Sequence, residues 1–218
     1  MKYLRKFATE AEVGSLPMPN VVFLADTKSV KYNYIPNGIY IQHTDGTLYS
    51  VEEWGEKGYG NTVANGVALV NAKASFVIHP SASTGNKPWI NPASLVEGVV
   101  TATSVEEAKN DFAGVANTEA ILAVPNANSA AAYWNSHNRF KSGEYGYIPS
   151  AGELNLIHEN KAEINAAMAA IGGTSVGTYI WSSTQASADK GWILKAEGIE
   201  QNDKTYTNGS RGILPLNI

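Results

Sequence analysis

The clearest hydrophobic pattern in the chain lies between residues 150 and 173. Apolar side chains recur there at helical spacing, at positions Leu154, Ile157, Ile164, Met168 and Ile171. Ser150 and Glu153 form a capping box before them, in which the hydroxyl and the carboxylate each accept a hydrogen bond from a free backbone N–H. Gly172 and Gly173 end the pattern. The stretch is therefore predicted to be a helix.

A second capping box precedes another, shorter helical pattern. It pairs Ser104 with Glu107, and the helix that it begins is predicted to end at Gly114. Between residues 117 and 134 the pattern fits a helix on either side of Pro125, and both alternatives stay open.

The first half of the chain has the alternating pattern of half-buried strands. Residues 37–80 are predicted to form two hairpins, the first turning at Asp45-Gly46. Residues 52–60 are predicted to be a polar connection between them. Residues 80–94 are rich in Pro, Ser, Asn and Gly and are predicted to be a loop, with Trp89 as an anchor against the sheet.

Strand patterns return after the long helix. Strands are predicted at Tyr179–Trp181, Gly191–Ala196 and Gly212–Leu216. Two polar loops are predicted between them, Ser182–Lys190 and Gly198–Ser210.

These elements divide the chain into three predicted parts. Residues 1–35 contain one short strand, Val21–Leu24, and too little apolar sequence for a core of their own. They are predicted to be an attachment arm that pairs with another protein, or alternatively a first strand folded onto the main domain. Residues 36–94 form a small β-hairpin region, and residues 95–218 form the main α+β domain.

Composition and charge narrow the possible partners. Of the 218 residues, 44% are apolar and only 17% are charged, which predicts a neutral-polar surface. The net charge is -4 and the basic residues form no dense cluster, which argues against nucleic acid as a partner. The sequence contains no run of about 18 apolar residues, so no membrane span is predicted. Because no apolar segment follows the basic start of the chain, no signal peptide is expected.

The residue types also argue against catalysis. The chain has no cysteine, which excludes disulfides, thiolate metal sites and cysteine nucleophiles. The histidines are scattered along the sequence, at His43, His79, His137 and His158. Glu153 is explained by its capping box. Because no nucleophile is paired with a base, we expect a protein that is not an enzyme and has no cofactor.

Several motifs in residues 95–218 resemble the C-type lectin fold. Ile148-Pro149-Ser150 with Gly152-Glu153-Leu154 matches its Leu-Pro-Ser and Gly-Glu-Leu elements. Tyr179 and Trp181–Thr184 match a Tyr-Trp-Ser-Ser-Thr turn with one residue inserted. The terminal Val-Arg-Pro is degraded, since three residues separate Arg211 from Pro215. The chain is similar to lectin-like modules of gut Bacteroidales and their phages, among them retroelement-diversified proteins and relatives of formylglycine-generating enzymes.

The resemblance implies an α+β fold in which two helices pack on a small antiparallel sheet and long polar loops bind a ligand. Carried over to this sequence, the binding positions are Gln185, Ser187, Asp189 and Lys190 in the first loop, and Asn202, Asp203, Lys204, Tyr206, Asn208 and Ser210 in the second.

Two further features refine the expected binding face. Calcium requires about six to eight oxygen ligands, and the Glu-Pro-Asn, Gln-Pro-Asp and Trp-Asn-Asp triplets of calcium-dependent lectins are missing, so no metal is expected. Trp181 and Trp192 can be core residues or platforms for a sugar, and their strand context favours the core. Tyr206 is the better contact residue, because tyrosine gives rigid contact area in binding loops.

The resemblance to phage-associated members favours one function and leaves two alternatives. The first is a virion surface protein, a head-fibre or tail-fibre component, that binds a glycan or protein of the host surface. The arm would then contact other virion proteins, and the chain would form a homo-oligomer, with a trimer as one option. The alternatives are a structural virion decoration or adaptor protein, and a bacterial surface adhesin, against which the missing signal peptide counts.

Overall fold

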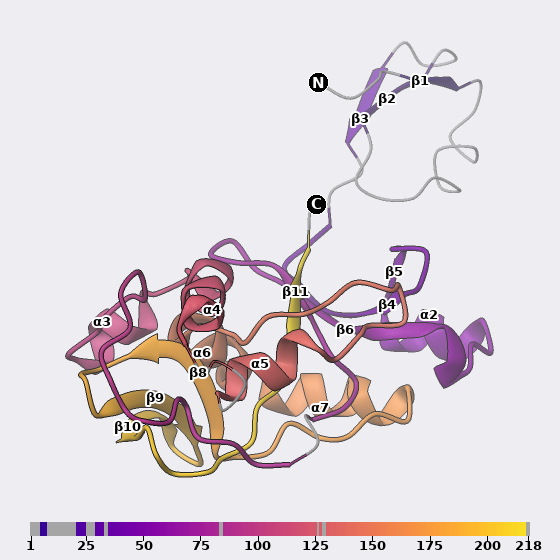
Figure 1. Ribbon diagram of the computed structural model, residues 1–218. Coiled ribbons are helices and arrows are strands. Elements are labelled where there is room, and N and C mark those ends of the chain that lie inside the picture. Colours follow the sequence, from indigo (N-terminus) through magenta and orange to yellow (C-terminus); the bar gives the residue numbers. More distant parts are fainter. Residues whose placement is uncertain are drawn as a thin grey trace.

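The computed structural model describes the chain over residues 5–7, 21–24, 29–32, 35–82, 85–125, 127 and 130–216, and describes side chains from residue 35 onward except at 134–136. Near the N-terminus, the strands β1 (Arg5–Phe7), β2 (Val21–Leu24) and β3 (Ser29–Tyr32) form a small sheet in that order. Figure 1 shows this sheet apart from the remaining elements. The strand predicted at Val21–Leu24 is confirmed; most of the predicted attachment arm lies outside the described residues.

A five-stranded antiparallel sheet forms one end of the body. Its order is β11-β7-β6-β4-β5, and its strands are β4 (Gly38–His43), β5 (Leu48–Tyr49), β6 (Ala64–Val70), β7 (Phe76–Ile78) and β11 (Ile213–Pro215). Both predicted hairpins are present in it. Because the last strand pairs with β7, this sheet joins the first and the last described segments of the body (Figure 1).

A second antiparallel sheet has the order β10-β9-β8, and its strands are β8 (Ile180–Gln185), β9 (Lys190–Lys195) and β10 (Gly198–Asp203). The loops predicted at 182–190 and 198–210 are therefore wrong in part, since residues 182–185 belong to β8 and residues 198–203 to β10, and both strands pair with β9. The pairing of β8 is irregular between Trp181 and Gln185, so the Trp-Ser-Ser-Thr segment bulges within a strand.

The helices are α2 (Val51–Glu56), α3 (Val105–Lys109), α4 (Gly114–Ala123), α5 (Ala131–Ser136), α6 (Ala151–Glu159) and α7 (Lys161–Ala170), with one 3-10 turn, η1 (Asn61–Val63). Both predicted capping boxes are confirmed, at Ser104 and at Ser150. The predicted long helix is two helices that meet at Asn160, whose side-chain amide donates to the Leu156 carbonyl (2.8 Å). Both alternatives for residues 117–134 occur, as α4 and α5.

One helix was not predicted. Residues 52–60 were expected to be a connection, but α2 begins there behind a capping box of Ser50 and Glu53. Trp54 on this helix is only 2% exposed and packs into the main core. Apolar burial of this one large ring stabilises a helix that is too short to be stable by itself.

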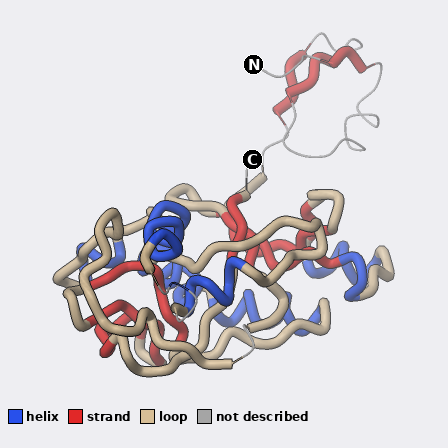
Figure 2. The backbone as a smooth tube through the Cα atoms, in the orientation of Figure 1, coloured by secondary structure: helices blue, strands red, loops and turns tan. Residues whose placement is uncertain are grey.

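Helices lie between the two sheets and also at the outer edges of the body (Figure 2). The helix α6 packs on β8, β9 and β10, and α7 packs on β4 and β6. The largest core cluster mixes side chains of both halves, among them Ile41 and Val67 with Leu154 and Ile164. The fold is α+β, as predicted. The predicted division at residues 94 and 95 runs through this shared core and through the five-stranded sheet.

Membrane insertion was not expected from the sequence. Within the described residues, none of the helices combines the length and apolar character needed to cross a bilayer.

Candidate ligand-binding face

Tyr179 combines an unusual backbone conformation with an exposed side chain. Its φ of 59° makes it the one non-glycine residue with positive φ in the described part of the chain, and its side chain is 56% exposed. Its backbone is held on both sides: the N–H donates to the Leu194 carbonyl (2.7 Å), and its carbonyl accepts from the Gly209 N–H (2.9 Å). Such strain costs about 1–3 kcal/mol and is often found at binding sites.

A hollow of about 360 Å³ opens beside this tyrosine. Its walls come from three segments that are far apart in sequence, and the lining residues are Ala82, Asn86, Ser175, Gly177, Thr178, Tyr179, Ile180, Gly209, Ser210 and Arg211. A bridge between Ile180 and Gly209 joins two of these segments. Hydroxyl, amide and aromatic groups therefore meet around one space, which we call the tyrosine hollow.

Arg211 fixes the base of the tyrosine hollow. It is 2% exposed and donates to the His79 carbonyl (3.2 Å), to the carbonyl and hydroxyl of Thr174 (2.9 and 2.7 Å), and to the Ser175 carbonyl (3.3 Å). Burial lowers the pKa of its guanidinium to about 10. The resemblance had placed Arg211 in a degraded terminal motif, and the structure gives it this clamping role.

Two buried donors at this place have no hydrogen-bond partner among the described residues. They are the Nε of Arg211 and the side-chain amide nitrogen of Asn208. A buried donor without an acceptor costs free energy, of the order of 1–3 kcal/mol. Arg211 lines the tyrosine hollow and Asn208 adjoins its lining residue Gly209. Both donor atoms are closed to solvent.

The structure separates the predicted binding positions into three groups. Ser187, Asp189, Lys190 and Tyr206 are exposed, Asn202 and Asp203 are half-buried, and Gln185, Lys204, Asn208 and Ser210 are buried. Of these ten positions, only Ser210 lines the tyrosine hollow.

Gln185 is not available to a ligand, which corrects its prediction as a contact residue. Its side-chain amide donates to the carbonyls of Val96 (2.8 Å) and Val99 (3.2 Å) and accepts from the Val96 N–H (3.0 Å). These bonds attach a long loop to β8, so the side chain belongs to the scaffold.

Lys204 needs the same correction, because its side chain is 0% exposed. Its ammonium donates to the Ser94 carbonyl (2.6 Å) and to Gln185 Oε1 (3.0 Å), and lies 4.2 Å from the centre of the Trp89 ring. Burial lowers its pKa to about 8, although the charge of Asp189 acts in the opposite direction. Trp89 is thus the anchor predicted from the sequence, and it is 1% exposed.

The exposed positions form turns at one edge of the second sheet. The Ser187 hydroxyl accepts from the N–H groups of Asp189 (3.2 Å) and Lys190 (3.1 Å). Hydrogen bonds from Thr205 lower the pKa of Asp203. The Lys204 N–H donates to the Asp189 carbonyl (2.8 Å), so the two predicted loops touch. Tyr206 is 60% exposed beside them.

Polar residues of the resemblance motifs form a buried network. The Glu153 carboxylate accepts from the Tyr147 hydroxyl (2.7 Å) and the Ser150 N–H (2.7 Å). Asp111 accepts from the Thr184 hydroxyl (2.5 Å). Burial raises the pKa of Glu153, and burial together with the charge of Glu153 raises that of Tyr147. This network links α6 to β8 and is closed to solvent, so it is scaffold.

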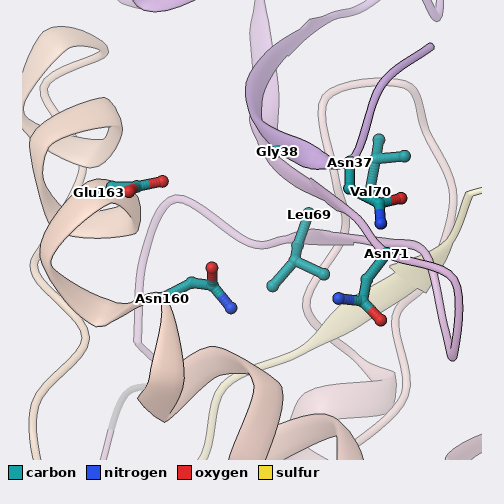
Figure 3. Close-up of a pocket in the computed structure, with 7 residues that line it drawn as sticks. All are labelled: Asn37, Gly38, Leu69, Val70, Asn71, Asn160 and Glu163. Carbon is teal, nitrogen blue, oxygen red and sulfur yellow. The ribbon is translucent and has the colours of Figure 1, made fainter.

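Two more hollows lie outside this face. One of about 210 Å³ is lined by Asn37, Gly38, Leu69, Val70, Asn71, Asn160 and Glu163. Figure 3 shows Asn160 and Glu163 on the helical side of it, and Asn71 on the opposite side. Asn160 and Asn71 already bond backbone groups, of Leu156 and Lys73 respectively. These amides therefore stabilise the ends of α6 and β6.

The other hollow, of about 310 Å³, is lined by Asn61, His79, Pro80, Ser81, Arg139, Lys141, Ile171, Gly172 and Gly173. We call it the basic hollow. It adjoins the tyrosine hollow at Thr174. The Thr174 N–H donates to the Pro80 carbonyl (2.8 Å), and the Thr174 hydroxyl accepts from the Ala82 N–H (3.2 Å).

Tyr179 and the basic hollow were not predicted as binding features. Tyr179 was interpreted as part of a strand motif, because a positive φ at a tyrosine leaves no signal in the sequence. Within the described ranges, no three His, Asp or Glu side chains gather as metal ligands.

Comparison with known proteins gives one fold-level relative. No family model and no curated protein matches the sequence. A solved structure of a fimbrial protein from Bacteroides ovatus is similar, with 15% identity and a TM-score of 0.60. The match covers 89% of this chain and 52% of the fimbrial protein, so the chain spans about half of that protein's length. At this identity the likeness shows a shared fold, and its description names neither a phage nor a lectin.

Proposed function

We propose that the chain is a non-catalytic surface-attachment protein of the fimbrial kind, and that the tyrosine hollow with Tyr206 beside β10 holds its ligand. The observation that carries the proposal is the strained and exposed Tyr179 at the rim of a polar hollow. Strained backbone conformations concentrate at ligand-binding and active sites, which supports a contact role for Tyr179.

The chemistry around the hollow supports a hydroxyl-rich ligand. Hydroxyl and amide side chains, Arg211 and a tyrosine line the space. Sugars offer both acceptor oxygens and apolar ring faces, and a glycan of a cell surface is therefore the ligand class that we favour.

The lectin-like motifs support the same interpretation. Under this proposal the chain has a C-type lectin-like fold, in which the five-stranded sheet receives the terminal strand and the β8–β10 sheet carries the binding loops. The fimbrial likeness favours the adhesin that the sequence offered as an alternative over the phage fibre expected first.

The proposal is tested on a panel of immobilised polysaccharides and glycoproteins. The full chain should bind at least one member, and the double variant Tyr179→Ser/Tyr206→Ser should lose at least about tenfold in affinity, because exposed tyrosines dominate such contacts. Val115→Ser, which removes an exposed apolar side chain on α4, is the control and should bind normally. Equal binding by the double variant and the control would refute the proposed face.

A further inference from the structure

The basic hollow carries two positive charges on its wall. Arg139 and Lys141 are both exposed on its wall, and no Asp or Glu is among its lining residues. Within the described part of the chain, neither side chain lies within ion-pair distance of a carboxylate. Two cations thus line one space that has no carboxylate on its wall.

The fold holds these two cations in place. Residues 139–145 form a tight hairpin, in which Arg139 and Tyr145 are bridge partners. The guanidinium donates to the Tyr145 hydroxyl (3.0 Å) and its carbon lies 4.7 Å from the centre of that ring. The Lys141 ammonium donates to the Asn61 carbonyl across the hollow. Both charged groups are thus oriented before any ligand arrives, which lowers the entropy lost on binding.

The opposite wall is closely packed backbone. Gly172 and Gly173 follow α7, and a Cβ on Gly173 would lie 2.9 Å from the Pro80 carbonyl oxygen. The half-buried His79 is fixed by the Ser81 N–H (3.0 Å) and by an edge contact with Phe140 (4.7 Å between ring centres). The hollow, at about 310 Å³, is at the small end of ligand pockets, which span about 300–1,000 Å³.

We propose that the basic hollow binds the anionic group of an acidic saccharide, a carboxylate or a sulfate ester, as a second subsite next to the tyrosine hollow. Arginine presents a planar fork that matches both anions, and lysine adds a point charge beside it. This inference rests on the proposed function only in taking a saccharide as the carrier of the anion. The shared Thr174 contact puts both subsites within reach of one oligosaccharide.

Three dextrans of equal length provide the test: neutral dextran, carboxymethyl-dextran and dextran sulfate. The full chain should bind one or both anionic dextrans at physiological ionic strength and should not bind the neutral one. The two anionic arms distinguish a carboxylate from a sulfate ester. The double variant Arg139→Gln/Lys141→Gln should weaken this binding at least about tenfold, because it removes two charge-assisted contacts.

A matched control removes the same charge elsewhere. Lys57→Gln/Lys73→Gln changes two exposed lysines that do not line the basic hollow and should bind as the unchanged chain does. Equal losses in both double variants, or no binding to either anionic dextran, would overturn the inference. A further variant, Tyr179→Gly, distinguishes a failure of this inference from a failure of the proposed function. It alters the tyrosine hollow and leaves Arg139 and Lys141 in place. Melting curves of the two double variants should match that of the unchanged chain, since the changed cations are exposed.

Discussion

The loops around β8–β10 have an inner side, whose side chains are buried, and an outer side, whose side chains are exposed. On the inner side, Lys204 and Arg211 are buried, and their hydrogen bonds hold neighbouring segments together. On the outer side, Tyr179 and Tyr206 are exposed. A polar loop residue therefore indicates a contact with a ligand only when its side chain reaches solvent. Stability and binding should respond separately to changes on the two sides.

The largest expected effect is on the inner side, at Arg211. Arg211→Ala removes the clamp on Thr174 and Ser175 and leaves their carbonyls and a cavity behind, so we expect the free energy of unfolding to fall by about 3–5 kcal/mol. Urea unfolding measures this loss. A decrease below 1 kcal/mol would show that the buried guanidinium does not hold the base of the hollow.

The second effect concerns Lys204 and depends on pH. Its pKa is about 8 in the folded chain, against 10.5 as the ordinary value, so the folded chain releases the proton first. Folded stability should therefore rise as the pH rises from 8 to 10.5, by at most about 3 kcal/mol. Lys204→Met should remove this rise. An equal rise in the variant would assign the effect to other groups.

A smaller effect of the opposite sign is expected at Glu153. Because burial raises its pKa, the folded chain keeps this proton to higher pH than the unfolded chain, and stability from this group falls as the pH rises above the ordinary value. Glu153→Gln keeps the shape of the side chain and should reduce this dependence while changing stability near pH 5 by less than about 1 kcal/mol. The pH dependence of stability is compared by thermal melts of the unchanged chain and the variant, recorded at steps of about one pH unit between pH 4 and pH 8.

The smallest expected change in stability is on the outer side. Tyr179→Gly places glycine at a φ of 59°, a conformation that glycine adopts freely, so stability should stay equal or rise by about 1 kcal/mol. The same urea titration checks it. A loss above 1 kcal/mol would mean that the tyrosine ring is a packing residue.

Much of the scaffold was predictable because its signals are local. Capping boxes located the starts of α3 and α6, and turn signals located the two hairpins of the five-stranded sheet. The limit is visible in one tetrapeptide, Ser-Val-Glu-Glu, which occurs at residues 50–53 and again at 104–107. Both copies form the same capping box. Only the second was interpreted as a helix start. The first copy begins α2, a short helix that depends on the burial of Trp54 in the main core.

The exposed positions of the proposed binding face were less predictable, because tertiary packing decides which polar side chains are buried. Gln185 and Ser187 stand two residues apart in one polar segment, and the first is buried while the second is exposed. The buried amide of Gln185 donates to the carbonyls of residues 96 and 99, which lie almost ninety positions earlier in the chain. Likewise, the hollow beside Tyr179 is assembled from three distant segments.

The central claim is that the outer side binds and the inner side only supports it. The most direct test is the affinity of Tyr179→Gly for the panel member that the full chain binds, measured together with its melting temperature. The account predicts an affinity at least about tenfold weaker at an unchanged or higher melting temperature. Unchanged affinity in a folded variant would contradict it.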